Sequence, residues 1–303
     1  MIKRSKPQKF RLRRTMLFIS AQKPGQIKDP YIYGADSIIM DLEDAVAENQ
    51  KDAARFLLYH ALTTIDYGNT EVIVRINGLN SPHWKEDVRV SIAGGADGIR
   101  IPKCESAKDV QIVEEAIEKA EEEFKVPKGR TLIMAALETP KAILNAYEIC
   151  TASPRMFGIA ISGGDLRRCM QVTQTPEGIE LFVARGQTVL AARAAGVQCF
   201  DTVYTDMDDM EGFKNEVIMV KKMGFDGKSL IHPKQIKIVH DIYKPTQKEI
   251  HDAERIVRAY REKSEKGEGV FTVDNKMIDV AFLPSAERII ALAKACGIYE
   301  GDL

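Results

Sequence analysis

The sequence predicts an α/β protein that folds as a closed (β/α)8 TIM barrel and ends in a helical extension. Eight short apolar runs alternate with longer amphipathic segments, which indicates βα repetition and a parallel sheet. Eight is also the number of parallel strands that closes such a sheet, and 303 residues suffice for a barrel with extensions. A doubly wound open sheet is the alternative architecture.

The predicted strands are short runs rich in β-branched and other apolar residues. In chain order they are Thr15–Ser20, Ser37–Asp41, Glu71–Ile76, Gly98–Pro102, Leu132–Leu137, Met156–Ile161, Phe200–Tyr204 and Gly227–Ile231. The segments between them carry apolar residues three and four positions apart, as amphipathic helices do. The predicted helices are Glu48–Ile65, Ala107–Phe124, Pro140–Thr151, Ile179–Ala195 and Glu211–Met223.

The chain divides into three predicted parts. Residues 1–14 contain seven lysines and arginines and form a basic arm, which we expect to be disordered over its first dozen residues. Residues 15–243 form the barrel. Residues 244–303 contain a charged helix to about Lys266, a break at Gly267-Glu268-Gly269 and a last helix from about Pro284. We expect this extension to pack on the barrel or on a neighbouring subunit.

The composition excludes several classes of protein. A net charge of −1 gives no attraction to nucleic acid. No window reaches the roughly 20 apolar residues that span a membrane. The five cysteines lie apart without Cys-x-x-Cys spacing, which favours reduced thiols over disulfides or structural zinc. We therefore expect a cytoplasmic protein that binds neither nucleic acid nor membranes.

Polar residues gather directly after the predicted strands. Barrel enzymes build their active sites from the loops at the C-terminal ends of the strands, so we expect these side chains to meet at one mouth. The segments are Asp41-Leu42-Glu43-Asp44, Arg75-Ile76-Asn77-Gly78, Pro102-Lys103, Glu138-Thr139-Pro140, Ser162-Gly163-Gly164-Asp165, Thr205-Asp206 and His232-Pro233.

Glu138 and Asp165 are the predicted metal ligands, because each follows an apolar strand directly. Two carboxylates without His or Cys at comparable positions favour Mg²⁺, for which Mn²⁺ is a substitute. The alternative is that each carboxylate caps the following helix or pairs with a cation. Asp165 also follows a Gly-Gly turn, so a simple turn role is open for it.

Arg75 is the predicted substrate-binding cation. A guanidinium at a strand end can grip a carboxylate or stabilise an enolate oxygen. The alternative is a structural ion pair with Asp41, Glu43 or Asp44, and both roles are compatible. These three carboxylates and Lys103 are expected to lie behind the site, where they orient Arg75 or metal-bound water.

Two lysines raise a different chemistry, in which an amine forms a Schiff base with the substrate. Lys103 lies at a strand end, but the carboxylates there would keep it protonated. Lys228 lies at the start of its strand, which places it at the opposite end of the barrel. His232 precedes a proline and is expected to be a hydrogen-bonding turn residue.

The strand-end segments resemble the family of the citrate lyase β subunit and its relatives, within the HpcH/HpaI-type aldolases. The resemblance extends from about Arg13 to the C-terminus, in order and at family spacing. The matching motifs are Ala35–Val46, Lys51–Arg55, Val74–Asn77, Arg100–Lys103, Ala136–Thr139, Phe200–Tyr204, Gly224–Ser229 and Pro245–Glu249.

This resemblance implies a Mg²⁺-dependent carbon–carbon lyase that cleaves a citryl thioester of coenzyme A or of an acyl carrier protein, releasing oxaloacetate and an acetyl thioester. Carried over by position, Glu138 and Asp165 hold the metal, and they bind the substrate together with Arg75 and Gly164. Asp279 matches an aspartate that reaches a neighbouring subunit's active site, so it joins Arg75 and Glu138 as a catalytic residue.

The resemblance also implies partners. They are a homo-oligomer, a trimer or hexamer, and the α and γ subunits of a citrate lyase complex. The basic arm has an alternative role in contacting an acidic carrier protein or the phosphates of coenzyme A.

Three segments depart from the β-subunit pattern. Ser20-Ala21 stands where Pro-Gly is usual, Gly163–Leu166 differs around the second ligand, and His232–Gln235 looks more like the free-standing coenzyme A lyases. A citramalyl-CoA or malyl-CoA lyase therefore stays open. The alternative outside the enzymes is a non-catalytic scaffold subunit of a lyase complex. The presence of Arg75, Glu138 and Asp165 argues against it.

Overall fold

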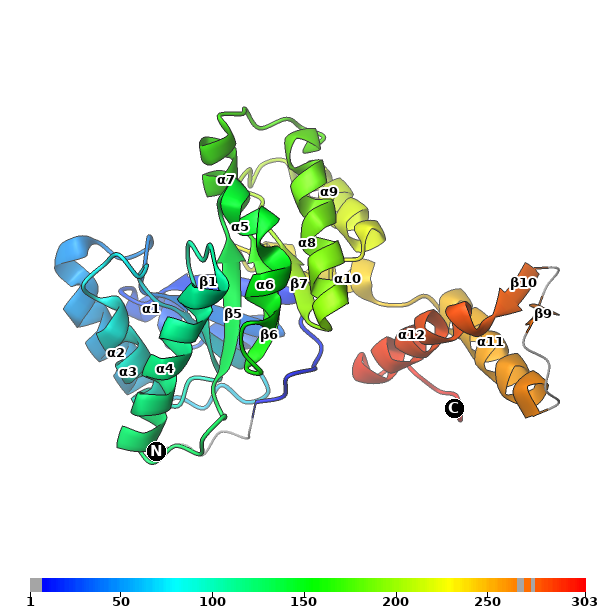
Figure 1. Cartoon of the computed structure of the whole chain (residues 1–303), viewed down its shortest axis with the longest axis horizontal. Helices are drawn as coiled ribbons and strands as arrows, with labels where there is room; N and C mark the ends of the chain where they lie inside the picture. The colour runs from blue at the N-terminus through cyan, green and yellow to red at the C-terminus, as the bar shows by residue number, and fades with distance from the viewer. Residues whose placement is uncertain (1–6, 266–269, 274–275) are drawn as a thin grey trace. The chain divides into compact units, whose positions relative to one another are not determined.

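Eight parallel strands close into a barrel in sequence order, from β1 to β8, in this computed structural model (Figure 1). The structure describes residues 7–265, 270–273 and 276–303. The predicted barrel is confirmed, and the doubly wound open sheet is wrong. The strands are β1 (Thr15–Ser20), β2 (Ser37–Asp41), β3 (Glu71–Arg75), β4 (Gly98–Ile101), β5 (Leu132–Leu137), β6 (Met156–Ile161), β7 (Gln198–Asp201) and β8 (Gly227–Leu230).

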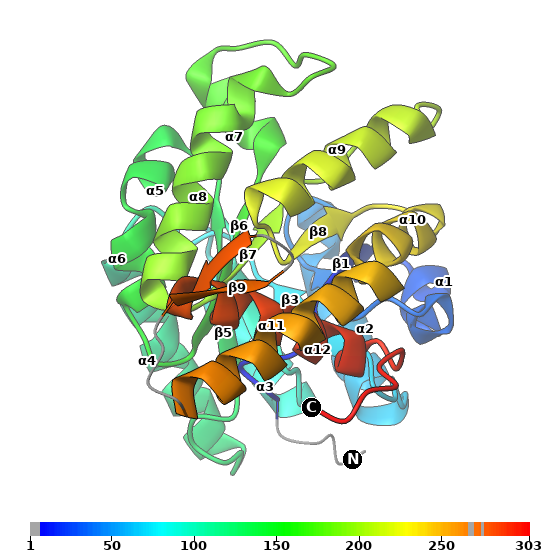
Figure 2. The same ribbon diagram turned by 90° about the vertical axis from the view of Figure 1, so that its right-hand side faces the viewer.

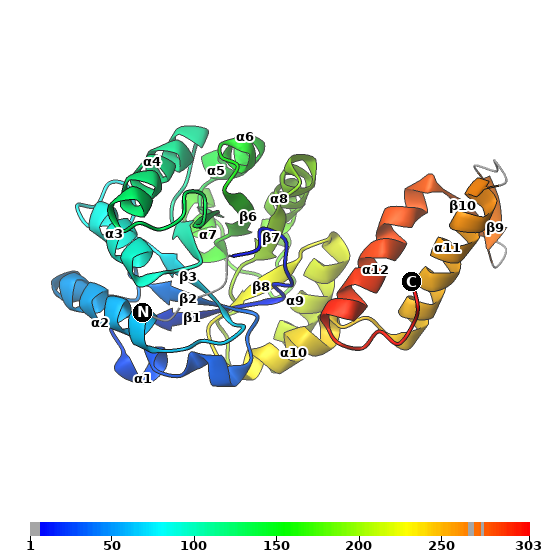
Figure 3. The same ribbon diagram turned by 90° about the horizontal axis from the view of Figure 1, so that it is seen from below.

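Helices surround the barrel on its outside (Figure 3). Those within predicted helical segments are α2 (Lys51–Thr64), α4 (Ala107–Glu123), α5 (Pro140–Leu144), α6 (Ala146–Thr151), α8 (Phe182–Ala195) and α9 (Met210–Met223). Four helices were not predicted: α1 (Pro24–Ile27), α3 (Trp84–Gly94), α7 (Gly163–Met170) and α10 (Lys234–Tyr243). α7 begins with two glycines, which are poor helix formers and concealed it. None of the helices in the described residues has the length and apolar content to cross a membrane.

Apolar side chains from alternate strand positions fill the barrel interior. Met16, Ile39, Ile73, Met134 and Phe200 are fully buried and belong to one cluster. This cluster covers the inner face of the strands and the helices cover the outer face. Burial on both faces explains why the strands read as continuous apolar runs.

The inward-facing row continues toward the mouth with charged residues. Because side chains alternate between the two faces of a strand, Asp41 faces inward like Ile39, and Arg75 like Ile73. Arg100 pairs with Arg75 in the register of β3 and β4, so it points to the same side of the sheet. Charged groups thus line the part of the barrel interior that lies nearest the C-terminal ends of the strands.

The N-terminal segment is attached to the barrel. Residues 1–6 of the predicted basic arm lie outside the described residues. Arg13 is fully buried and donates from Nε and Nη2 to the carboxylate of Glu71, each at 2.7 Å. Arg14 pairs with Asp36 at 2.8 Å, and Arg11 donates to a backbone carbonyl just before β3 at 2.9 Å. Arg11, Arg13 and Arg14 thus attach the end of the arm to the barrel, and the disorder expected over the first dozen residues stays a prediction.

Residues His240–Leu303 form a second compact unit. Its helices α11 (Gln247–Glu265) and α12 (Leu283–Ala295) lie side by side (Figure 2). Their contact is apolar and buries Ala253, Val257, Ala286 and Ile290. The predicted helical extension is therefore present, and its packing on the barrel or on a neighbouring subunit stays a prediction.

Two short strands within this unit were not predicted. β9 (Val270–Val273) and β10 (Lys276–Asp279) pair in antiparallel orientation between the two helices. The predicted break at residues 267–269 lies outside the described residues.

The seventh strand lies earlier than predicted. β7 covers Gln198–Asp201 rather than Phe200–Tyr204, so Thr205 and Asp206 belong to a loop and the prediction that they end the strand is wrong. Gln198 concealed the start of β7, because a polar residue interrupts the apolar pattern there. Its side chain is used at the N-terminal end of the barrel, where Nε2 donates to a backbone carbonyl of the N-terminal segment at 3.1 Å.

A buried charged cluster lies outside the barrel, between β7, β8 and the helices α8 and α9. Lys228 donates from Nζ to Asp201 and to Glu216, each at 2.6 Å, and Arg185 donates from Nε to Asp201 at 2.9 Å. Burial raises the pKa of Asp201, but Lys228 and Arg185 outweigh it and lower this pKa to about 2. Lys228 is therefore part of an ion-pair cluster, which argues against its use as a Schiff-base amine.

We predict that Asp201→Asn lowers the free energy of unfolding by about 3–5 kcal/mol, because it removes one partner of a buried ion-pair cluster. Urea denaturation at pH 7, followed by circular dichroism, measures the change. Asp206→Asn is the matched control, since Asp206 is exposed in the following loop, and it should stay within about 0.5 kcal/mol of the wild type. Equal losses in both variants would contradict the assigned end of β7.

Candidate functional site

All the predicted site residues of the barrel except Glu43 line one of two adjoining cavities at its mouth, and Asp165 lines both. The first cavity, of about 380 Å³, is lined by residues that include Phe18, Asp41, Asp44, Arg75, Arg100, Gly164 and Asp165. The second, of about 320 Å³, is lined by residues that include Lys103, Glu105, Glu138, Thr139, Asp165 and Cys169. The tertiary structure thus brings together side chains that lie more than a hundred positions apart in the chain.

Glu138 follows β5 and is buried with an exposed fraction of 1%. Within the described residues, neither of its carboxylate oxygens has a hydrogen-bond partner. Burial, with smaller contributions from Glu43 and Asp165, raises the pKa of Glu138 to about 7. The next residue, Thr139, caps α5 by accepting from the amide of Ala142 at 3.2 Å. The alternative that Glu138 itself caps this helix is therefore wrong.

Asp165 lies in the first turn of α7, at the end where a helix favours negative charge. Its carboxylate accepts from Arg168 at 2.5 Å, so Asp165 makes the local ion pair that was the alternative, and its role as a metal ligand stays a prediction. The turn before it is held by the amide of Gly163, which donates to Oγ1 of Thr202 at 2.8 Å. Gly164 borders the first cavity, and an added Cβ there would meet no heavy atom within 4 Å.

The two carboxylates fit a hard divalent cation. Among the described residues Glu138 is a buried acceptor without a hydrogen-bond partner, and the nearby charge of Asp165 contributes to raising the pKa of Glu138. The described residues contain no group of three or more His, Cys, Asp or Glu side chains that could hold a metal. A site with two protein carboxylates suits Mg²⁺, which keeps waters and takes oxygens from a substrate.

Arg75 is paired as the structural alternative predicted. It donates from Nε and Nη2 to the two oxygens of Asp41 at 2.7 and 2.6 Å, and its Nη1 lies 3.1 Å from Glu43. Burial lowers the pKa of Arg75, but the hydrogen bonds and charges of Asp41 and Glu43 outweigh it and keep this pKa above its ordinary value. Asp41 and Glu43 therefore hold the guanidinium in place at the wall of the first cavity.

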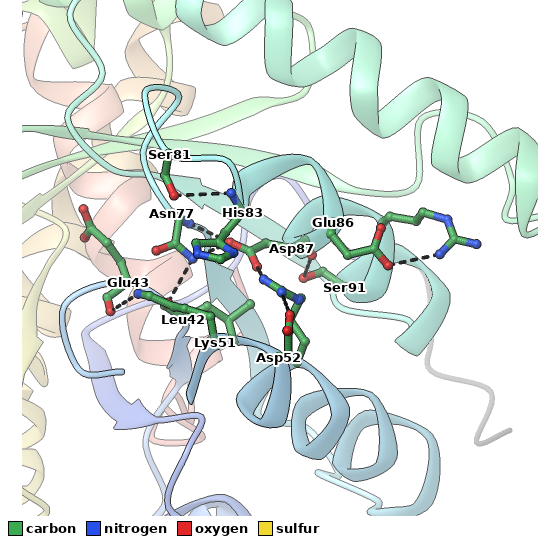
Figure 4. Close-up of polar contacts among 12 residues, drawn as sticks. Leu42, Glu43, Lys51, Asp52, Asn77, Ser81, His83, Glu86, Asp87 and Ser91 are labelled. Atoms are coloured by element: carbon green, nitrogen blue, oxygen red, sulfur yellow. Dashed lines mark hydrogen bonds and ion pairs between the residues drawn. The ribbon is translucent and has the colours of Figure 1, made fainter. Parts of the chain in front are cut away.

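The loop that carries Glu43 is fixed by a network of polar contacts (Figure 4). Lys51 donates from Nζ to the backbone carbonyls of Leu42 and Glu43 at 2.8 and 2.7 Å. Asn77 donates from Nδ2 to the same carbonyl of Leu42 at 3.0 Å and to Asp87 at 2.6 Å. The loops after β2 and β3 are thereby joined, so Glu43 occupies a defined position behind Arg75.

Lys103 contacts Glu43 with its ammonium group, and its backbone adopts the left-handed conformation with φ of 48°. Burial lowers the pKa of Lys103, but Glu43 outweighs it and the pKa is raised above its ordinary value. A protonated amine is a poor nucleophile. This geometry supports an orienting role and disfavours the Schiff-base alternative.

Arg100 was not among the predicted site residues, but it lines the first cavity from β4. It is buried with an exposed fraction of 1%, and its guanidinium lies 5.1 Å from the ring centroid of Phe18. A charged residue in an otherwise apolar strand was the available signal. The predicted site residues lie near or after the strand ends, whereas Arg100 lies in the middle of the predicted strand Gly98–Pro102.

Asp279 belongs to the C-terminal unit, at the end of β10. Its carboxylate accepts from the amide of Ala281 at 2.8 Å and caps the 3₁₀ helix η4 (Val280–Phe282). Its catalytic role stays a prediction. His232 accepts at Nδ1 from the amide of Lys234 at 3.1 Å, as a turn residue does.

A family described as HpcH/HpaI aldolase/citrate lyase matches residues 14–233, which contain all eight barrel strands. The chain belongs to this family. Among its relatives, citrate lyase subunit beta of Leuconostoc mesenteroides subsp. cremoris is 47% identical over 292 residues, which are 96% of this chain and 97% of that protein. The family resemblance inferred from the strand-end motifs is therefore confirmed.

Two further relatives show the range of the family. A (3S)-malyl-CoA thioesterase of Cereibacter sphaeroides is 37% identical over 286 residues, 94% of this chain and 96% of that protein. The crystal structure of CitE from Mycobacterium tuberculosis in complex with magnesium, acetoacetate and coenzyme A superposes with a TM-score of 0.74. It is 29% identical and covers 93% of this chain and 98% of its own.

We predict that Glu138→Gln weakens Mn²⁺ binding by at least about tenfold, because a ligand matters at least as much as the groups that orient it. Isothermal titration calorimetry on the metal-free protein measures the affinity. In EDTA the variant should be at least as stable as the wild type, since the substitution removes a buried carboxylate without a partner.

Glu105→Gln is the control for this measurement. Glu105 lines the same cavity but is engaged by Thr139 at 2.8 Å and by Lys141 at 3.2 Å. Its substitution should leave the Mn²⁺ affinity unchanged. An unchanged affinity in Glu138→Gln would exclude Glu138 as a ligand.

Proposed function

We propose that this protein is a Mg²⁺-dependent carbon–carbon lyase that cleaves a citryl thioester into oxaloacetate and an acetyl thioester. The observation that carries the proposal is the buried, unpartnered carboxylate of Glu138 beside Asp165 at the mouth of the barrel. The 47% identity to a citrate lyase subunit beta and the magnesium in the CitE complex support it.

Glu138 and Asp165 would hold the cation. When bound, Mg²⁺ supplies positive charge that orients the hydroxyl and carboxylate of the substrate and lowers the pKa of the hydroxyl. The burial of Glu138 keeps competing water away from one side of the site.

The reaction needs one bond to break and two protons to move. The substrate hydroxyl loses a proton, and the bond from its carbon to the thioester methylene breaks. The electron pair goes to the thioester enolate, which takes up a proton and becomes the acetyl thioester. Arg75, held by Asp41 and Glu43, is oriented to stabilise the developing negative charge. Asp279 of a neighbouring subunit is the proposed proton donor.

The proposed partners follow from the same function. The thioester is carried by coenzyme A or by an acyl carrier protein, and the α and γ subunits of a citrate lyase complex are the proposed protein partners. A homo-oligomer, as a trimer or hexamer, is supported by large exposed apolar side chains on the mutually packed helices α5, α6 and α8. These are Leu144, Tyr147, Phe182, Val183 and Leu190.

A second candidate is a lyase or thioesterase for malyl-CoA or citramalyl-CoA. The observation in its favour is the 37% identity to a (3S)-malyl-CoA thioesterase over nearly the whole chain. A thioesterase releases free thiol from the ester, and a lyase releases a 2-oxo acid, so the two products separate the candidates.

We predict Mg²⁺-dependent release of oxaloacetate from citryl-CoA or from a citryl carrier protein, with citramalyl-CoA and malyl-CoA assayed in parallel. Oxaloacetate is followed by coupling to malate dehydrogenase, and free thiol is followed with a thiol reagent. EDTA should abolish turnover, because the cation holds the reacting oxygens. Glu138→Ala and Asp165→Ala should each lower kcat by at least about 100-fold.

Glu105→Gln again serves as the control and should keep wild-type turnover. Turnover that survives EDTA would contradict the metal mechanism. Silence with every thioester, in the presence of Mg²⁺, would favour the non-catalytic scaffold.

A further inference from the structure

Arg100 is a buried cation without a local counter-ion. Within the described residues, its Nε and Nη1 atoms have no hydrogen-bond partner, and no salt bridge to its guanidinium is found. Its side chain nevertheless borders the first cavity. Burial, reinforced by Arg75, lowers the pKa of Arg100 to about 10, so the group stays charged at neutral pH.

Three other buried arginines of the barrel each have a carboxylate partner. Arg13 donates to Glu71, Arg155 to Glu121 and Arg185 to Asp201, in each case with two nitrogens on one carboxylate. A buried cation is costly unless an anion accompanies it. Arg13, Arg155 and Arg185 lie away from the mouth and each has such an anion. Arg100 borders the cavity, and no anion among the described residues pairs with it.

The acidic neighbours of Arg100 are already engaged. Asp41 binds Arg75 with both oxygens, and Glu43 lies between Arg75 and Lys103. Glu138 acts on the pKa of Arg100 but is not within ion-pair distance, and it is assigned to the metal. The Nε and Nη1 donors of Arg100 are therefore available to an anion that is not part of the described chain.

The substrate offers such an anion. A citryl thioester has two free carboxylates, one on the hydroxyl-bearing carbon and one at the end of the remaining methylene arm. The first would lie with the hydroxyl beside the cation that Glu138 and Asp165 are proposed to hold. Resting on the proposed function, we propose that Arg100 binds the second carboxylate, the one at the end of the arm, which becomes the far carboxylate of oxaloacetate.

This contact makes Arg100 a specificity-determining residue. Citramalyl thioesters have a methyl group in place of this arm, and malyl thioesters have a hydrogen. With either substrate the guanidinium stays buried and unpaired, and a site built for a polar group discriminates strongly against an analogue that lacks it. Arg75 differs, since Asp41 and Glu43 already compensate its charge.

Arg100→Met tests the assignment, because methionine keeps much of the side-chain length and removes the charge. We expect kcat/KM for the citryl thioester to fall at least about 100-fold and kcat/KM for citramalyl-CoA to change less than about fivefold. Calorimetric titration in Mg²⁺ should show weaker binding of oxaloacetate and unchanged binding of pyruvate. Arg100→Lys, which keeps a charge, should restore part of the preference for oxaloacetate.

Arg155→Met is the matched control, since Arg155 is an equally buried arginine that precedes β6 at the other end of the barrel. It should lower Tm, because it leaves Glu121 without its partner, and leave the ratio of citryl to citramalyl activity unchanged. Arg100→Met should keep or raise Tm, because it removes an unpaired buried charge. A merely structural role for Arg100 would give the opposite pattern.

The outcomes separate the two proposals. If the wild type cleaves no thioester, the proposed lyase function fails. The role of Arg100 is then decided by comparing the affinities of the wild type and Arg100→Met for oxaloacetate and for pyruvate. If Arg100→Met lowers citryl and citramalyl activity equally, Arg100 serves the part common to both substrates and this inference is overturned. Equal oxaloacetate binding by the wild type and Arg100→Met overturns it as well.

Discussion

Five carboxylates of the predicted site, Asp41, Glu43, Asp44, Glu138 and Asp165, lie close together at the mouth of the barrel, and their mutual repulsion is the constraint that the site must satisfy. Asp41, Glu43 and Asp44 lie within ion-pair range of Arg75, and Glu43 also contacts Lys103. The remaining two, Glu138 and Asp165, lie on the side of β5 and β6, where no cation among the described residues contacts Glu138. A divalent cation would relieve that repulsion, which supports the proposed metal position.

The register of the strands determines where these charged side chains lie. Asp41, Arg75 and Arg100 occupy paired positions on three successive strands, so a change in one strand's register would turn its charged side chain out of the barrel. The loop after β2 is less regular, and the contacts of Lys51 and Asn77 with the carbonyl of Leu42 hold it in place. Rigid strands and one fixed loop thus determine where the charges lie.

Paired and unpaired buried charges serve different purposes here. Pairs such as Arg13 with Glu71 and Arg155 with Glu121 join segments of the fold and are complete without a ligand. Within the described residues, the carboxylate of Glu138 has no hydrogen-bond donor and the guanidinium of Arg100 has no anionic acceptor. Because an unpaired buried charge costs stability, such groups mark the places where a metal and an anionic substrate group would bind.

The sequence by itself determined the barrel, most strand positions and the placement of Glu138 and Asp165 at the barrel mouth, because strand periodicity is local and polar residues after apolar strands are visible in one dimension. It failed for β7, where the polar Gln198 concealed the strand, and for α7, which begins with glycines.

Only the tertiary structure decided which charges are satisfied. Arg75 and Arg100 both lie on strands that pair in register, but Asp41 binds Arg75, and Arg100 has no ion-pair partner within the described part of the chain. That difference depends on contacts between segments far apart in the chain, which no local pattern encodes.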